Sequence, residues 1–120
     1  MELRTRASGG VWLLELEGTL TIGDGDLVLR KAVGELLEEG RSRLVLDLDG
    51  VRYIDSAGIG EILACKKRAR DTGGDVRLLK PRKRVHEALV MSRVSEVFQI
   101  FTDEAQALEE GKDWPGTRKG

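Results

Sequence analysis

The sequence contains few of the residues that build disulfides, metal sites and catalytic triads. Its 120 residues include one cysteine, Cys65, and one histidine, His86. A single cysteine cannot form an internal disulfide, which indicates a reducing compartment. A hydrolytic serine needs a base such as histidine, and no serine here lies in a Gly-x-Ser-x-Gly motif. No cluster of metal-ligating residues is visible, so we expect no metal ion, and the glycines form neither a dinucleotide fingerprint nor a P-loop.

Long apolar runs, aromatic residues and net charge are also scarce. No stretch approaches the ~18 apolar residues of a membrane span, and residues 1–10 lack the apolar core of a signal peptide. Aromatic residues make up 4% of the chain and the formal net charge is −1, which disfavours binding to nucleic acid. We therefore expect a cytoplasmic protein that binds neither a membrane nor nucleic acid.

The sequence does contain an alternation of strand and helix patterns. A hairpin is expected over residues 2–17, around a Ser-Gly-Gly turn. A helix over Leu27–Glu39 follows, closed by Gly40, then a buried strand over Arg43–Gly50 and a helix ending near Asp71. The later elements are a strand at 75–80, a helix opened by Pro81, a strand at 97–101 and a helix capped by Thr102.

This order predicts a single α/β domain, in which an N-terminal hairpin and alternating helices and strands form a mixed sheet with helices packed on it. We expect the domain over residues 1–110 and a flexible tail over residues 111–120. In such sheets the loops at the carboxyl ends of the strands carry function. The segment Asp49–Ser56 is predicted to be such a loop.

The segment Asp47-Leu48-Asp49-Gly50 has one enzymatic interpretation. An apolar strand followed by Asp-x-Asp-Gly resembles the first motif of the haloacid-dehalogenase phosphotransferases. There Asp47 would be the nucleophile and Asp49 the acid/base, with Mg²⁺ holding the phosphate. Val51 stands where that family has a threonine, and the remaining chain is short for its later motifs. A strand ending in a polar turn is the simpler interpretation.

The stretch Tyr53–Leu63, YIDSAGIGEIL, places two glycines in the first turn of a helix, where each costs ~1 kcal/mol against alanine. Ser56 has the ordinary interpretation of a helix cap, worth ~1 kcal/mol. The other interpretation is that Ala57, Gly58 and Gly60 leave a bare ridge around Ser56 for another protein's backbone. A phosphate there would lie at the positive end of the helix dipole and add about −1.5 to −2 charges to the contact.

Two basic clusters occur at residues 66–70 and 80–84. They would form either one positive patch for an acidic or phosphorylated partner, or two solvated faces. The balanced charge of the chain favours solvated faces. His86 is expected to be a surface or half-buried structural residue, and Cys65, which lies on the apolar arc of its helix, is expected to pack in the core.

The sequence VLDLDGVRYIDSAGIGEIL resembles the core motif of the anti-sigma-factor antagonists, members of the STAS domain family. The resemblance runs over about residues 2–110. It includes the hairpin with Gly18, the helix ending at Gly40, the Gly-Gly before the next strand and the ending VFQIFTDEAQAL. Its most specific part is Asp-Ser-x-Gly between a strand and a helix. The resemblance implies a STAS-like fold.

In that family a cognate protein kinase, which also acts as the anti-sigma factor, phosphorylates the serine after the aspartate. This role maps onto Ser56. The resemblance implies that the unphosphorylated chain binds the anti-sigma factor and serine kinase and thereby frees the sigma factor. Phosphorylation of Ser56 blocks that binding, and a separate phosphatase resets it. Because the kinase supplies ATP, the resemblance implies a regulator without a cofactor and without enzymatic activity.

The residues that the resemblance places at the partner contact lie before and within the first turn of the helix, with one acid from an earlier loop. They are Asp55, Ser56, Ala57, Gly58, Ile59, Gly60 and Asp24. Many antagonists carry an acid where this chain has Thr21, and Asp24 lies further along. Two alternatives stay open, a STAS scaffold that binds without phosphorylation and a small Mg²⁺-dependent phosphohydrolase acting through Asp47.

Overall fold

The computed structural model describes residues 1–110 and Trp114. One mixed sheet contains the strands β1 (Glu2–Ser8), β2 (Val11–Leu20), β3 (Arg43–Ile54), β4 (Asp75–Leu79) and β5 (Ile100–Phe101), in that spatial order. The helices are α1 (Gly25–Glu38), α2 (Ser56–Asp71), α3 (Lys83–Met91) and α4 (Glu104–Ala107), with a short 3-10 helix η1 (Val94–Glu96). The predicted α/β class with a mixed sheet is confirmed.

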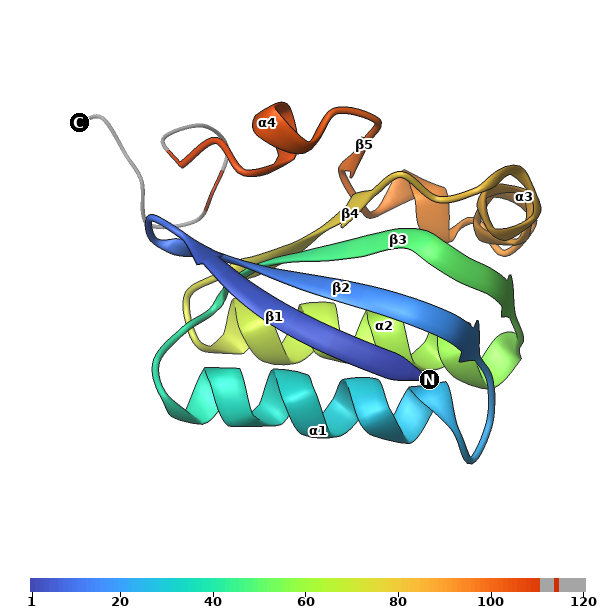
Figure 1. The fold of residues 1–120 in the computed structure, drawn as a ribbon, viewed down its shortest axis with the longest axis horizontal. Helices are drawn as coiled ribbons and strands as arrows, with labels where there is room; N and C mark the ends of the chain where they lie inside the picture. The colour runs from blue at the N-terminus through green and yellow to red at the C-terminus, as the bar shows by residue number, and fades with distance from the viewer. Residues whose placement is uncertain (111–113, 115–120) are drawn as a thin grey trace.

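Only the first pair of strands is antiparallel. The hairpin joins β1 to β2, and the pairs β2–β3, β3–β4 and β4–β5 are all parallel. Parallel neighbours need a crossover between them, and a helix usually supplies it. Figure 1 shows that α1 and α2 lie side by side under one face of the sheet, whereas α4 lies beyond the opposite face. The carboxyl ends of β2 and β3 therefore meet at one edge of the sheet.

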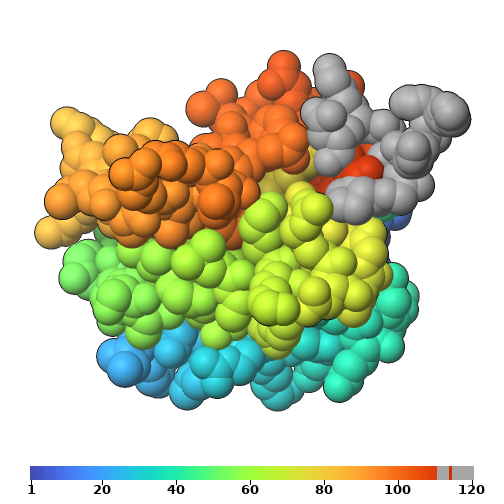
Figure 2. Space-filling view, turned by 180° about the vertical axis from the view of Figure 1, so that it is seen from behind, coloured from blue at the N-terminus to red at the C-terminus, as the bar shows by residue number. Residues whose placement is uncertain are grey.

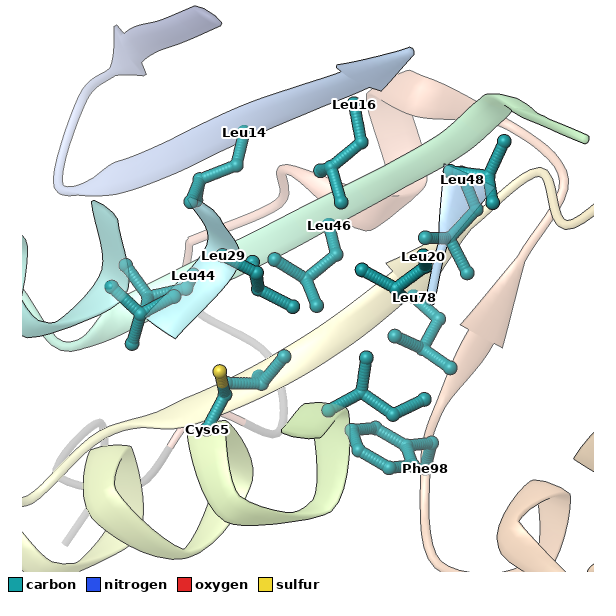
Figure 3. Packing of buried hydrophobic residues seen from close by; sticks show 14 of the residues in the cluster. Leu14, Leu16, Leu20, Leu29, Leu44, Leu46, Leu48, Cys65, Leu78 and Phe98 are labelled. Carbon is teal, nitrogen blue, oxygen red and sulfur yellow. The ribbon is translucent and has the colours of Figure 1, made fainter. Parts of the chain in front are cut away.

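The main core lies between the sheet and the helices α1 and α2. Leu14, Leu46 and Leu78 come from three neighbouring strands and are fully buried against this layer, and they point into it (Figure 3). Burying each such side chain contributes ~1.5–3 kcal/mol. Cys65 of α2 is fully buried in the same cluster, and burial raises the pKa of its thiol to about 12. The predicted packing role of Cys65 is confirmed.

The second face of the sheet is covered by the end of the chain. Leu13, Val45 and Leu79 form a smaller cluster with Ala107 and Trp114, which is 2% exposed. The indole of Trp114 donates to the carbonyl of residue 109 at 2.8 Å. Residues 111–113 and 115–120 of the predicted tail lie outside the described residues. Trp114, however, is a core residue, so its assignment to a flexible tail is corrected.

The strand β3 is longer than the sequence pattern suggested. The predicted loop from Asp49 to Ser56 is wrong, because the strand continues to Ile54 and only Asp55 links it to α2. Val51 is fully buried and pairs with Gly18. Gly50 permits this extension, since a Cβ atom there would lie 2.6 Å from the carbonyl oxygen of Leu16.

The last elements also differ from expectation. The predicted strand at 97–101 is reduced to Ile100–Phe101, and Phe98 packs into the main core instead. Thr102 does not cap the last helix, because Asp103 accepts the hydrogen bond from the amide of Ala105 at 3.0 Å. A carboxylate is as good an N-cap as a hydroxyl, and here the chain places it one residue later.

Candidate functional site

The candidate site is the edge of the sheet where β2 and β3 end. Leu20 and Ile54, the last residues of these strands, are partners in the sheet register. The amide of Asp55 then donates to the carbonyl of Leu20 at 3.3 Å. Immediately afterwards the chain turns into α2 at Ser56, so the loop after β2 and the start of α2 lie next to each other.

Asp55 holds these two segments together with one carboxylate. Its Oδ1 accepts a hydrogen bond from the amide of Gly58 at 2.9 Å, and its Oδ2 accepts one from the amide of Ile22 at 3.0 Å. These bonds, first that from Gly58 and then that from Ile22, lower the pKa of the Asp55 carboxyl. Asp55 is therefore the N-cap of α2, and the ordinary interpretation of Ser56 as the cap is wrong.

Ser56 is the first residue of α2 and its side chain is exposed. Since the Asp55 carboxylate already accepts the hydrogen bond from the amide of Gly58 at the start of α2, the Ser56 hydroxyl is not needed for capping. It makes no recorded hydrogen bond within residues 1–110. The hydroxyl lies at the positive end of a helix of 16 residues, where a negative group is electrostatically favoured. Chemically, this is a hydroxyl that an external enzyme can reach and modify.

The two glycines of the motif have different surroundings and different roles. Gly58 is buried, and a Cβ atom there would lie 2.0 Å from the carbonyl oxygen of Leu20 and 2.9 Å from the side chain of Ile54. Gly58 thus lets α2 pack closely against β2, and its predicted place on an exposed ridge is wrong. Gly60 is exposed, and nothing lies within 4 Å of a Cβ atom built there. Only Gly60 leaves the surface beside Ser56 bare.

The remaining predicted contact residues lie near this point but differ in exposure. Ala57 and Ile59 are half-buried, and Ile59 packs against the main core. Asp24 lies exposed in the loop that Asp55 holds, and accepts a hydrogen bond from the Thr19 hydroxyl at 3.5 Å. The structure therefore brings Asp24 to the same edge as Ser56, as a separate exposed carboxylate.

Sequence reasoning missed the exposed apolar residues around Ser56. Ile22 is 75% exposed although it lies in the loop bound by Asp55. Tyr53 is 45% exposed, and the Arg84 guanidinium of α3 lies 5.5 Å from the centre of its ring. Leu63 is 37% exposed two turns along α2, whose surface lies open between α1 and the later segments (Figure 2). Ile22 carried a usable signal, as the one large apolar residue in a Gly-Asp loop.

The acidic pair of the enzymatic alternative lies elsewhere. Asp47 is inside β3, seven residues before its end at Ile54, and its carboxylate accepts the amide of Asp49 at 3.0 Å. Burial raises the pKa of the Asp47 carboxyl. Both acids line a depression of about 200 Å³, where the other charged residues are three acids, Glu2, Glu15 and Glu17, and one base, Arg4. These acids repel a phosphate ester, and the described residues contain no group of three acids, histidines or cysteines placed to hold a metal ion.

The basic cluster at residues 66–70 is neutralised by acids of its own chain. Lys66 and Arg70 both contact Asp75, at 2.6 and 3.2 Å, and Arg68 contacts Glu61 at 3.0 Å. These pairs support the interpretation as solvated faces. His86 is exposed on α3. Within residues 1–110, no helix has both the length and the apolar character needed to cross a bilayer.

Comparison with protein families gives one match over most of the chain. The model of the STAS domain matches residues 2–107. The anti-sigma F factor antagonist of Paenibacillus polymyxa is 30% identical over 102 residues, which are 84% of this chain and 86% of that protein. The relatives thus include an anti-sigma factor antagonist of nearly the same length.

Solved structures share the fold. A Thermotoga maritima protein, described as a candidate anti-sigma factor antagonist, superposes with a TM-score of 0.83 at 26% identity, covering 90% of this chain and 92% of that one. The Bacillus cell fate determinant SpoIIAA in its phosphorylated form has a TM-score of 0.70 at 16% identity, covering 89% and 96% of the two chains. This second likeness concerns the fold alone.

Proposed function

Because the chain belongs to the STAS domain family, we propose that it is an anti-sigma-factor antagonist switched by phosphorylation of Ser56. In its unphosphorylated form it binds an anti-sigma factor that is also a serine kinase. The kinase transfers a phosphoryl group to Ser56, which releases the complex, and a phosphatase restores the free hydroxyl. The chain acts as a regulator, and the kinase brings the nucleotide.

The observation that carries this proposal is the exposed Ser56 hydroxyl, which capping does not use. A serine that served the fold would be expected to bond to the amides of its own helix, and Asp55 already does so. Next to Ser56, the bare position at Gly60 and the exposed side chain of Ile22 provide a surface that another protein can approach closely.

A phosphate on Ser56 would act at this surface and leave the fold intact. It would add about −1.5 to −2 charges at the edge of the sheet where Asp24 is also exposed. The positive end of α2 tolerates the phosphate within the monomer. A partner that covers Ile22 and Tyr53 with apolar side chains would have to desolvate it, and unpaired charges are costly to bury. Phosphorylation therefore disfavours the complex more than the fold.

The test is a phosphorylation assay with the cognate serine kinase and ATP, read by intact-protein and peptide mass spectrometry. We expect one phosphate, on Ser56, and none in Ser56→Ala. Ser92→Ala is the matched control, because Ser92 is also an exposed serine at a helix end and bonds to the carbonyl of Ala88. Phosphate on another residue, unchanged in Ser56→Ala, would contradict the proposal.

A second variant separates the switch from a constitutive scaffold. Ser56→Asp should keep the unfolding midpoint of the wild type and lose measurable binding to the kinase. Ser92→Asp should keep the binding, although its unfolding midpoint should fall, because the carboxylate cannot donate to the carbonyl of Ala88 and lies at the negative end of α3. Binding that is equal in Ser56→Asp and the wild type, together with an unmodified Ser56, would instead favour a scaffold that binds without phosphorylation.

A further inference from the structure

The strand β1 has a neighbour on one side only. Its residues Glu2–Ser8 pair with β2, and no strand of residues 1–110 lies beyond it. Most of β1 is exposed, including Thr5 and Ala7. An open edge of this length offers unpaired amides and carbonyls to another strand, and proteins usually block such edges with proline, bulges or charged side chains, lysine above all. The sequence of β1 contains no proline and no lysine, and its three charges, Glu2, Arg4 and Arg6, are of both signs, so they can pair with those of a second copy.

Two like charges face each other where β1 begins. Glu2 is the register partner of Glu17, and like charges directly opposite in a sheet are destabilising. No ion pair is recorded for either carboxylate among residues 1–110. The next row on this face has opposite charges, because Arg4 is the partner of Glu15, with its Nε 3.9 Å from a carboxylate oxygen. The row of Glu2 is therefore short of a positive charge.

The other face of β1 borders a groove with both polar and apolar lining. The groove has a volume of about 580 Å³, and its polar lining residues are Thr5, Lys31, Glu35, Glu39 and Arg41. Its apolar lining comes from β1, β2 and α1 and consists of Leu3, Trp12, Val28, Ala32 and Leu36. The groove thus runs along the open edge, where a molecule that pairs with β1 would also cover it.

We propose that β1 is the interface of a homodimer, in which it pairs antiparallel with β1 of a second copy around a two-fold axis at Arg4. In this register Glu2 faces Arg6 of the second copy, and Arg6 faces its Glu2. Within its own chain Arg6 contacts Glu104 at 3.0 Å and Glu15 at 3.7 Å, so in the dimer its guanidinium would be shared with Glu2 of the second copy. In the central row the two copies of Arg4 face each other, but each also faces its own Glu15, so the row as a whole is neutral.

Other registers fit less well. Side chains on one face of a strand alternate with those on the other, so a symmetric antiparallel pair can shift only by whole steps of the pleat. A two-fold axis at Thr5 would place Arg4 against Arg6 twice. An axis at Leu3 would also give Glu2 an arginine, but strand pairing would then stop at Thr5 and leave Arg6 outside. The axis at Arg4 uses the strand from Glu2 to Arg6 and satisfies both acids.

The dimer would leave the phosphorylation site free. Ser56 lies beyond the carboxyl end of β3, whereas the interface runs along the outer edge of β1. Each copy would also bring its groove beside β1 to the interface, so that Leu3 and Val28 lose contact with water. The inference is independent of the proposed switch, because its readout is the mass of the free protein without kinase or ATP.

The first test is sedimentation equilibrium over a wide range of protein concentrations. We expect a monomer–dimer equilibrium in the wild type. Glu2→Arg should raise the dimer dissociation constant at least about tenfold, because it places arginine against Arg6 twice. Glu38→Arg is the matched control, because Glu38 is exposed on α1 and carries the same charge change away from β1; it should leave the constant unchanged. Arg4→Thr, which removes the facing arginines, should lower it.

A cysteine cross-link tests the register. The native Cys65 is buried and its thiol pKa is raised to about 12, so an introduced cysteine is the only reactive one expected among residues 1–110. Under mild oxidation Arg4→Cys should form a covalent dimer, because it faces its own copy at the axis. Leu3→Cys should form no covalent dimer, because residue 3 faces Thr5 of the second copy in this register. Circular dichroism checks that each variant keeps the wild-type fold.

Each other outcome overturns the inference. A wild type that stays monomeric throughout, or a dimer that Glu2→Arg and Glu38→Arg weaken equally, would show that β1 is not the interface. Cross-linking of Leu3→Cys in place of Arg4→Cys would show that the proposed register is wrong.

Discussion

The carboxylate of Asp55 accepts the amide of Ile22 at 3.0 Å, across the end of the sheet. The same carboxylate caps α2 through the amide of Gly58. One side chain thus fixes both the most exposed apolar residue near the site and the helix that begins with Ser56. In the proposed function Asp55 positions the surface, and the neighbouring serine carries the change of charge.

The clamp formed by Asp55 is its pair of hydrogen bonds to the amides of Ile22 and Gly58. Replacing Asp55 should test this clamp directly. Asp55→Ala removes a helix cap and the bond to Ile22, and should lower the free energy of unfolding by ~1–2 kcal/mol in urea titrations. Asp103→Ala is the matched control. It removes a cap of the same kind from α4, which has only 4 residues, and should cost less. A loss in Asp55→Ala no larger than the loss in Asp103→Ala would contradict the double role of Asp55.

The clamp should also make stability depend on pH in the acid range. The folded-state pKa of Asp55 lies below its ordinary value of 3.8. The stabilisation is therefore complete above the pKa of the unfolded chain and is lost as the pH falls through the folded-state pKa. We expect the difference in unfolding free energy between the wild type and Asp55→Asn to be constant near neutrality and to shrink below about pH 4. A difference that grew towards acid pH would contradict the assignment.

The two glycines of the motif should respond oppositely to alanine. Gly58→Ala places a methyl group against the carbonyl of Leu20, and should lower the free energy of unfolding by ~1–3 kcal/mol. Gly60→Ala meets no neighbour, and should raise it by up to ~1 kcal/mol because alanine favours helix. Thermal unfolding of both variants measures the two changes in stability. Stabilisation by Gly58→Ala would mean that α2 does not pack closely on β2.

An exposed apolar residue near Ser56 should matter for binding and little for folding. Ile22→Ala should weaken binding to the kinase partner by about tenfold or more, because apolar side chains at the centre of an interface carry much of its energy. Met91→Ala is the control, since Met91 is 85% exposed at the end of α3. Calorimetry measures the affinities, and both variants should unfold like the wild type. Equal affinities would exclude Ile22 from the interface.

Much of the fold followed from the alternation of apolar residues. The buried run Leu44–Leu46 and the helical spacing of Leu29, Val33 and Leu36 are local patterns, and the structure buries all of these residues. The continuation of β3 past Gly50 could not be predicted in this way. It depends on the close approach of β2 at Leu16, and the pair Asp49-Gly50 is normally a turn signal.

The site was predictable in place but not in the role of each residue. The Asp-Ser-x-Gly spacing identified the segment that begins α2. Asp55 caps the helix if α2 begins at residue 56, and Ser56 would cap it if α2 began one residue later. The sequence permits either. The function of Gly58 depends on the carbonyl of Leu20, which is 38 residues earlier in the chain, so no local pattern could reveal it.

Trp114 has a consequence for the order in which the protein is completed. It follows every strand in the sequence, yet it covers the face of the sheet formed by Leu13, Val45 and Leu79. Domains form while the ribosome extends the chain from its N-terminus. The layer between the sheet and the helices α1 and α2 can therefore assemble first, while the opposite face of the sheet stays exposed to water. That layer can exclude water only after Trp114 has left the exit tunnel. A chain released before that point would expose the apolar face of its sheet to neighbouring chains.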